Sequence, residues 1–241
     1  DIYGGLSSVF DYGPMGAELK RNIKNAWWKA NVHNRSDIYG FDSAILMHPT
    51  AWKSSGHVDG FADPMVDCKS CKKRVRQDQL KERTSAPVHQ STSKTLYECP
   101  ECGAKIDLKD TPARMFNLML KTFLGAVEEE AAVCYLRPET AQGMFVNFIN
   151  MLDSMHPKLP FGMAQIGKSF RNEVTVGNFT FRMREFEQME IEYFVNPKED
   201  EKMHQMWIEE RFNWYTDLGI CKENLRKRKH EKSELAHYAK A

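Results

Sequence analysis

The sequence predicts an α+β fold, in which a mostly antiparallel sheet is flanked by helices and interrupted by a cysteine-bearing insertion. Residues 161–195 alternate in polarity as two long strands would, joined by a short loop. Pro14, Pro138 and Pro197 each precede a run whose apolar residues recur at helical spacing. Two Cys-x-x-Cys pairs, beginning at Cys68 and Cys99, bracket a polar segment.

The N-terminal part is expected to form a helix followed by a strand. The helix runs from Pro14 to about Val32, and its apolar stripe consists of Leu19, Ile23, Ala26, Trp27 and Ala30. Asp37–His48 has the pattern of a strand that ends at Pro49, because proline cannot donate to a ladder. Ala51–Asp63 is polar and contains glycine, which predicts a loop at a site or an interface. His57 in this loop is either catalytic or hydrogen-bonded scaffolding.

The two cysteine pairs predict a metal site. Each pair lets two thiolates converge on one ion, and two pairs complete a tetrahedral set of four sulfurs, from Cys68, Cys71, Cys99 and Cys102. Sulfur ligation with no vacant position favours structural Zn²⁺. The insertion, residues 63–110, has few large apolar residues, so we expect the metal rather than a core of its own to hold it together. Arg83–Ser93 within it is predicted to be mobile.

Three segments follow the insertion. Thr111–Val127 is consistent with a helix or with a buried strand. Cys134–Arg137 is predicted to be a strand, and Pro138 to open a helix with a buried stripe of Ala141, Phe145, Phe148, Ile149 and Leu152. Glu139 then lies at the N-terminal edge of this helix. It either serves a site at the strand-to-helix junction or complements the helix dipole.

The two strands of residues 161–195 have one polar face each. Same-parity residues of a strand share a face, so Gln165, Ser169, Arg171 and Glu173 lie together on the first strand. The even face of the second strand carries Arg182, Arg184, Phe186, Gln188, Glu190 and Glu192, while the odd face is mostly apolar. Gly177 and Asn178 suit the turn between the strands. The polar face is either solvated or a binding site.

The C-terminal part is predicted to be helical and basic. Pro197–Leu218 forms a helix closed by Gly219, with Ile208, Phe212 and Tyr215 as its apolar stripe. Lys222–Lys232 is either a solvated helix face or a contact for an RNA backbone. Cys134 and Cys221, the two cysteines outside the pairs, are expected to be buried.

Composition limits the class of protein. The 241 residues are 41% hydrophobic and 28% charged, with a mean hydropathy of -0.58 and a net charge of +1. The net charge indicates no polyanion partner by itself, and no apolar run suits a membrane span. Cysteine pairs of this kind are typical of a reducing cytoplasm. The sequence has no leader pattern and begins with Asp1, which indicates a trimmed start.

The segments GKSFRNE (Gly167–Glu173) and TFRMREFEQMEIEYF (Thr180–Phe194) resemble motif 2 of the class II aminoacyl-tRNA synthetases. DIYGGLSSVFDYGPMGAELKRNIKNAWW, SGHVDGFADPMVDC, RPETAQGMFVNF and SELAHYAKA are similar to the dimeric (α2) glycyl branch of that family. The resemblance covers nearly the whole chain. It implies that residues 1–62 hold motif 1, the dimer-forming element, that 63–110 are a zinc-knuckle insertion, and that 111–241 carry motif 2. It also favours a strand at Phe116–Thr122.

The resemblance also assigns site residues. Arg171 would be the catalytic residue and would bind the α-phosphate of ATP, Glu173 would bind the adenine amino group, and Phe186 would stack on adenine. The ATP-binding set is Arg171, Asn172, Glu173, Phe181, Arg182, Met183, Arg184, Glu185 and Phe186. Glu139 and Glu190 would bind the glycine ammonium group, and Arg76 resembles an arginine involved in substrate binding. The glycine-binding set is Arg76, Glu139, Phe186, Glu187, Gln188, Met189 and Glu190.

The implied activity is that of a ligase which uses ATP and Mg²⁺ to form glycyl-adenylate and transfers glycine to the 3′ end of tRNA(Gly). The family's motif 3 and anticodon-binding domain have no counterpart in these 241 residues, so we expect an incomplete catalytic domain. Two alternatives stay open: a zinc-ribbon RNA-binding module with a catalytically dead hairpin, and a class II enzyme for another small amino acid.

Overall fold

The computed structural model describes residues 2–83, 96–127, 129, 132–174, 179–235 and 239. The chain divides into two compact units, Asp1–Tyr193 and Phe194–Ala241. The predicted mobile segment Arg83–Ser93 lies outside the described residues except for Arg83, and the predicted turn residues Gly177 and Asn178 lie outside them as well.

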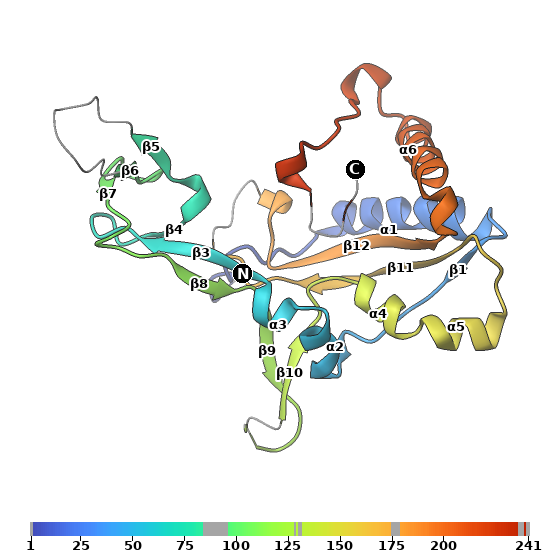
Figure 1. Ribbon diagram of the computed structural model, residues 1–241, viewed down its shortest axis with the longest axis horizontal. Helices are drawn as coiled ribbons and strands as arrows, with labels where there is room; N and C mark the ends of the chain where they lie inside the picture. The colour runs from blue at the N-terminus through green and yellow to red at the C-terminus, as the bar shows by residue number, and fades with distance from the viewer. Residues whose placement is uncertain are drawn as a thin grey trace. The chain divides into compact units, whose positions relative to one another are not determined.

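The first unit is built on a sheet with strand order β1-β11-β12, comprising Ile38–Gly40, Phe161–Phe170 and Glu185–Phe194. β1 runs parallel to β11, with Ile38 opposite Gly162. Helix α1 (Pro14–Trp28), which continues into a π-helical turn at Lys29–His33, packs along this sheet (Figure 1). The two long strands and the N-terminal helix are therefore confirmed.

Helix α1 covers the odd face of β12. Its Lys20 and Lys24 contact the two carboxylate oxygens of Glu187 at 2.8 and 3.1 Å. Trp27 is buried, whereas Leu19 is 61% exposed, so the predicted apolar stripe is wrong at its N-terminal end. Because α1 occupies the odd face, the even face of β12 is left for other parts of the chain.

A second sheet has the order β2-β10-β9, comprising Leu46–Met47, Val133–Leu136 and Leu120–Phe123, with antiparallel pairing. Helices α2 (Pro49–Ser54) and α3 (His57–Gly60) follow β2. Trp52 is fully buried and packs with Met119 and Tyr135 in the core beneath them. The loop predicted at Ala51–Asp63 is therefore wrong, since a buried tryptophan fixes helical structure there.

The predicted strand Asp37–His48 is also two elements rather than one. β1 and β2 belong to different sheets, and the residues between them make isolated contacts, such as the backbone hydrogen bond from the N–H of Phe41 to the carbonyl oxygen of Ala164. Ser43 Oγ lies 2.9 Å from the amide of Gln165 on β11. Thr111–Val127 contains β8 (Arg114–Asn117) and β9, so its interpretation as strand is confirmed.

The cysteine-bearing insertion forms two small antiparallel sheets. Their strand orders are β4-β3-β8 and β5-β6-β7, where β3 is Ala62–Asp67, β4 Arg74–Arg76, β5 Lys81–Arg83, β6 Leu96–Glu98 and β7 Lys105–Ile106. A buried cluster joins the two sheets and consists of Val66, Cys68, Val75, Leu80, Cys99 and Ile106. The expectation that the insertion has no core of its own is therefore wrong: the core is small, and two of the paired cysteines are part of it.

The helix predicted after Pro138 is broken in two. α4 (Ala141–Val146) and α5 (Phe148–Met155) are separated by Asn147, whose side chain donates to the carbonyl oxygen of Gly143. Ala141, Met144 and Met151 are buried, while Phe145 and Ile149 are exposed, so the buried stripe is rotated from the predicted one. The predicted stripe is correct at Ala141 and wrong at those two positions.

The second unit contains helix α6 (Asp200–Asp217), preceded by a 3₁₀ turn at Pro197–Glu199. Gly219 has a φ of +94°, as expected for a residue that closes a helix. No residue of α6 is buried, so the predicted stripe has no core beneath it among the described residues. The basic run Lys222–Lys232 has 3₁₀ turns at Lys222–Asn224 and Lys232–Glu234 rather than an α-helix. Cys221 is exposed, contrary to expectation, whereas Cys134 is buried.

Among the described residues, no helix combines the length and apolar character that crossing a membrane would require.

Candidate active site

Arg171 directly follows the end of β11 and lies against Phe186 of the even face of β12. Its guanidinium carbon is 5.3 Å from the ring centre of Phe186 on β12 and 5.4 Å from that of Phe61. Its Nε donates to the carbonyl oxygen of Pro138 at 3.1 Å. Two aromatic faces and a backbone acceptor therefore fix a permanent positive charge whose remaining donors are available to an anion.

A cavity of about 600 Å³ opens beside Arg171. Seven of the nine residues that the sequence assigns to ATP line it: Arg171, Glu173, Phe181, Arg182, Met183, Glu185 and Phe186. Phe10, Tyr12, Lys20, Lys168, Thr180, Glu187 and Met189 complete the lining. A cavity of this size, with cations and aromatic rings in its wall, suits a nucleotide-sized anion.

Asn172 and Arg184 do not line this cavity. The backbone N–H of Asn172 donates to the carbonyl oxygen of Leu118, at 2.8 Å. Arg184 donates from Nε to the carbonyl oxygen of Glu173 and from Nη1 to that of Ser7. Arg184 thus ties the N-terminal segment to the end of the first strand, which is a scaffolding contact in this structure.

Three carboxylates interact on this side of the sheet: the charges of Glu139 and Glu190 act on Glu192, and the charge of Arg171 acts on Glu139. Glu190 and Glu192 follow Phe186 and Gln188 on the even face of β12, and Glu139 comes from the segment before α4. Ser169 on β11 donates to Gln188 at 2.7 Å, and Thr140 donates to Glu190. The structure therefore brings Glu139, Gln188 and Glu190, all predicted, onto one face.

The carboxylates of this group differ in their acidity. The hydrogen bond from His57 lowers the pKa of Glu139, helped by Gln142 and the charge of Arg171, against the effect of burial. Burial, together with the charges of Glu190 and Glu139, raises the pKa of Glu192 to about 7. The group thus holds one carboxylate that stays ionised and one that can hold a proton near neutrality.

Three residues predicted for glycine lie outside this carboxylate group, although Glu187 and Met189 line the 600 Å³ cavity. Glu187 and Met189 are on the odd face of β12, and Glu187 is paired with the two lysines of α1. Arg76 on β4 contacts Asp63 at 3.0 Å and Asp78 at 2.9 Å. The hydrogen bond to Asp78 raises the pKa of Arg76, with smaller contributions from the charges of Asp63, Asp78 and Glu173, and Arg76 is not among the residues that line the 600 Å³ cavity.

The floor of the site is a buried polar network. Arg137 is 2% exposed and donates to the carbonyl oxygens of Lys168 and Ser43, both at 2.7 Å. Burial lowers its pKa against the effect of Asp42. A Cβ at Gly167 would collide with the guanidinium of Arg137. This network fixes β11 against the segment that carries Glu139.

The residue sets assigned to ATP and glycine omit Thr140, Glu192 and Arg137. Strand alternation places Glu192 on the same face as Glu190, without assigning it a ligand. Thr140 and Arg137 could not be found from periodicity, because they lie outside both long strands.

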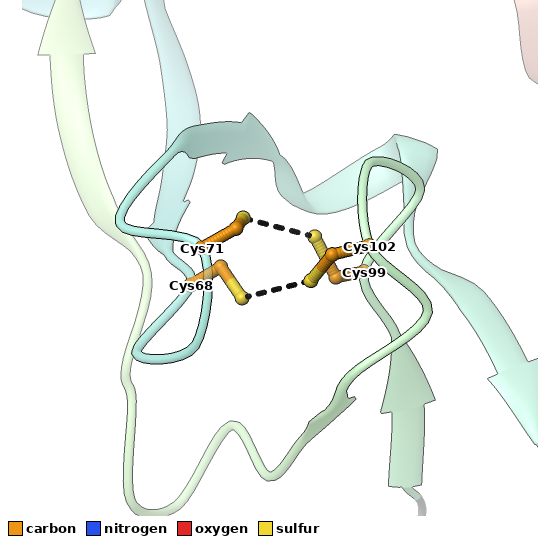
Figure 2. Close-up of side chains that lie close together, drawn as sticks. All are labelled: Cys68, Cys71, Cys99 and Cys102. Atoms are coloured by element: carbon orange, nitrogen blue, oxygen red, sulfur yellow. Dashed lines mark hydrogen bonds between the residues drawn. The ribbon is translucent and has the colours of Figure 1, made fainter.

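The four paired cysteines converge in the insertion (Figure 2). Their Sγ atoms all lie within 4.8 Å of one another, with Cys68–Cys102 at 3.7 Å and Cys71–Cys99 at 3.9 Å. Zinc–sulfur bonds of about 2.3 Å in a tetrahedron place neighbouring sulfurs about 3.8 Å apart. Backbone hydrogen bonds at Cys71 and Ser70 lower the pKa of Cys68 to about 7, against burial. The four cysteine sulfurs are therefore placed as the ligands of one tetrahedrally coordinated metal ion would be.

Comparison with known proteins finds one matching family and several similar proteins. Residues 125–241 match the family described as "tRNA synthetase class II core domain (G, H, P, S and T)". The chain is 52% identical to the glycine--tRNA ligase of Thermobifida fusca, 54% to that of Cutibacterium acnes and 49% to that of Thermus thermophilus. Each match covers 100% of this chain and 52%, 51% and 53% of the relative, so the chain spans about half the length of these relatives.

One solved structure is similar in fold. It is titled as the RNA binding domain of threonyl-tRNA synthetase from Cryptosporidium parvum, and it superposes with a TM-score of 0.54 at 17% identity, covering 88% of this chain and 38% of that one. At this identity the likeness concerns the fold alone. The chain is thus similar to glycine--tRNA ligases along its whole length, and residues 125–241 match the class II tRNA synthetase core domain.

Proposed function

We propose that the protein activates glycine with ATP to form glycyl-adenylate and pyrophosphate, and then transfers glycine to the 3′ end of tRNA(Gly). The observation that carries this proposal is the identity of about half of all residues to proteins named glycine--tRNA ligase, across 100% of the chain. The arrangement of Arg171, Phe186 and the three carboxylates on one sheet face supports it.

The nucleotide would bind in the cavity beside Arg171. Attack of the glycine carboxylate on the α-phosphorus builds negative charge on the phosphate oxygens, and a fixed guanidinium stabilises that charge. Phe186 offers a ring for adenine, and Glu173, which is 9% exposed, an acceptor for its amino group. Mg²⁺ would neutralise the phosphates. No side chain has to act as a nucleophile, since positioning and charge are sufficient for phosphoryl and adenylyl chemistry.

Glycine would bind at the carboxylates. An ammonium group is the only cation that glycine offers, and a charge-assisted hydrogen bond to Glu139 or Glu190 contributes roughly 1.5–3 kcal/mol. A substrate with a side-chain methyl group must be forced into a closely packed site, which costs about 1–3 kcal/mol. The site can therefore prefer glycine over alanine by shape alone.

Several further features belong to this proposal. Cys68, Cys71, Cys99 and Cys102 would hold a structural Zn²⁺, which supplies no chemistry to the reaction but crosslinks the two knuckles of residues 63–110. Residues 1–62 would carry motif 1 and form a homodimer. Residues 111–241 would form the motif 2 part of the catalytic core. The protein would work in the cytoplasm, where its tRNA substrate is found.

The test is ATP–pyrophosphate exchange by the full-length protein, with glycine, alanine and serine compared. We expect glycine to support exchange best, and Arg171→Ala and Glu190→Ala each to reduce it at least 100-fold, as loss of a charge-stabilising donor typically does. Glu223→Ala, which changes an exposed carboxylate of the second unit, is the matched control and should leave exchange unchanged.

Unchanged exchange in both site variants would refute the assignment of the site residues, and a preference for serine or alanine would refute glycine as the substrate. Calorimetry that finds no ATP binding would favour an RNA-binding module instead.

A further inference from the structure

His57 is held between two aromatic rings at the start of α3. Its ring centre is 5.4 Å from that of Trp52, at an interplanar angle of 79°, and 5.3 Å from that of Phe61. The His57 side chain is 13% exposed. Packing on both sides therefore fixes the position of the imidazole, and Phe61 is the same ring that supports Arg171.

The two ring nitrogens of His57 have different partners. Nδ1 lies 2.8 Å from the hydroxyl oxygen of Ser55, and Nε2 lies 3.4 Å from Oε1 of Glu139. The Ser55 hydroxyl is also 3.2 Å from the carbonyl oxygen of Trp52. An ionised carboxylate can only accept hydrogen bonds, so its contact with Nε2 is favourable only when Nε2 carries a proton.

Ser55 makes this proton arrangement possible in both charge states of the ring. With a neutral imidazole, the Ser55 hydroxyl donates to Nδ1, and Nε2 donates to Glu139. With a protonated imidazole, Nδ1 donates to Ser55, whose hydroxyl donates to the carbonyl oxygen of Trp52 instead. Nε2 therefore donates to Glu139 in either state, because the Ser55 hydroxyl reorients when Nδ1 gains or loses its proton.

The hydrogen bonds to Glu139 use only one of its oxygens. Gln142 Nε2 donates to Oε1 at 3.1 Å, and His57 Nε2 faces the same atom. Within the part of the chain that the structure describes, no hydrogen bond reaches Oε2 of Glu139. One oxygen is thus fixed and the other is left for a ligand, close enough to Glu192 for their charges to interact.

We propose that His57, supported by Ser55, is a positioning residue that holds Oε1 of Glu139 so that Oε2 faces the ammonium group of the amino-acid substrate. This inference deepens the proposed function and rests on it for the identity of the ligand. His57 takes no part in the chemical step: it donates a hydrogen bond to a carboxylate, and the carboxylate binds the substrate.

The experiment measures KM for glycine and KM for ATP separately in the exchange reaction of the full-length protein. His57→Phe keeps a ring between Trp52 and Phe61 but removes both nitrogens. We expect KM for glycine to rise roughly tenfold, KM for ATP to change less than about twofold, and Tm to stay near the wild-type value. His57→Gln, whose amide nitrogen can occupy the place of Nε2, should recover most of the loss. His204→Phe, at an exposed position of α6, is the control and should change neither KM.

A double-mutant comparison with Glu139→Gln distinguishes positioning of the Glu139 carboxylate from a general effect of His57→Phe on the structure. In a Glu139→Gln background, His57→Phe should add little further loss, because the carboxylate that it positions is already gone. An unchanged KM for glycine, an equal rise in both KM values, or a loss that simply adds to that of Glu139→Gln would each overturn the inference.

A wrong assignment of the proposed function would give a different result from a wrong assignment of His57. In that case the wild-type protein shows no glycine-dependent exchange, whatever residue 57 is. The ring protons of ¹⁵N-histidine-labelled protein then still test the geometry by NMR. A protonated Nε2 of His57 across the pH range supports the arrangement with Ser55 and Glu139, and an unprotonated Nε2 overturns it.

Discussion

Glu192 is the residue whose ionisation should be visible in function. Its pKa is raised to about 7 by burial and by the charges of Glu190 and Glu139, while His57 and Arg171 act on Glu139. An ionised Glu192 attracts an ammonium group more strongly than a protonated one. We therefore predict that KM for glycine falls as pH rises through about 7, and that Glu192→Gln removes this step. A wild-type KM that is flat from pH 6 to 8 would contradict the prediction, and KM for ATP provides the internal control.

The same residue gives a stability prediction with a definite sign. The folded pKa of Glu192 is raised from 4.5 to about 7, so between these values the folded protein binds more protons than the unfolded chain. Stability then falls as pH rises through this window, by up to about 3 kcal/mol. Glu192→Gln should raise Tm at pH 8 and leave it nearly unchanged at pH 4.5. Thermal unfolding at the two pH values measures the difference, and an equal shift at both would refute the ionisation as its cause.

Gly167 and Arg137 provide a test of the polar network below the site. A methyl group at position 167 would collide with a guanidinium that is buried and already hydrogen-bonded to two carbonyl oxygens. We expect Gly167→Ala to cost about 1–3 kcal/mol of stability, because the guanidinium cannot move without leaving those oxygens unpaired. Gly60→Ala is the matched control, since a Cβ there meets nothing within 4 Å. Urea unfolding compares the two, and equal midpoints would show that the network adapts.

At this scale, strand alternation alone could predict one row of the site. Phe186, Gln188 and Glu190 share a face because the period of a strand is fixed by backbone geometry. Periodicity could not show what lies opposite that row. Thr140 contacts Glu190 across 50 residues of sequence, Phe61 packs against Arg171, and His57 contacts Glu139; only the folded structure brings these segments together.

The insertion carries both the cysteine cluster and Arg76, whose charge interacts with that of Glu173 in the lining of the cavity beside Arg171. β4 carries Arg76, which is held by Asp63 and Asp78, and Glu173 contributes to its raised pKa. The strand follows the Cys68–Cys71 knuckle directly. If a metal ion fixes this knuckle, the position of β4 against the cavity depends on the metal.

Removal of the metal should therefore weaken nucleotide binding. We predict that chelation, or Cys71→Ser with Cys102→Ser, releases about one zinc per chain and raises KM for ATP severalfold, with a smaller change in KM for glycine. The apolar core of the insertion should keep part of its structure, so complete unfolding is not expected. Zinc content by mass spectrometry and the two KM values are the measurements. Cys221→Ser, an exposed cysteine outside the cluster, is the control. A metal-free protein with an unchanged KM for ATP would refute the coupling.

Elements with a long unbroken pattern could be predicted from the sequence, and interrupted ones could not. β11, β12 and α1 each carry their pattern over ten or more residues. The helix after Pro138 could not be traced, because the side chain of Asn147 bonds back to Gly143 and breaks it. The prediction of one strand at Asp37–His48 was wrong for a related reason. Ser43 pairs with Gln165 through side chains, and such a tertiary contact cannot be predicted from local strand propensity.

At the scale of the whole molecule, the untested expectation is a dimer formed through residues 1–62. Helix α1 presents Met15 and Leu19 to solvent, 88% and 61% exposed, while its opposite side pairs with Glu187 of the sheet. Exposed apolar side chains on a well-formed helix are typical of a surface that a partner covers. The resemblance of this region to motif 1 makes a second copy of the chain the expected partner.

Leu19→Glu should therefore shift the protein from dimer to monomer. A buried charge opposite its own symmetry mate is unfavourable in a two-fold interface, because each subunit introduces the same carboxylate. Sedimentation equilibrium over a range of concentrations should show an increase of at least tenfold in the dissociation constant. Val127→Glu, which changes an apolar residue that is 64% exposed outside residues 1–62, should leave the dimer intact. If both variants dimerise like the wild type, the interface lies elsewhere; if the wild type is a monomer at every concentration, the exposed face of α1 has another partner.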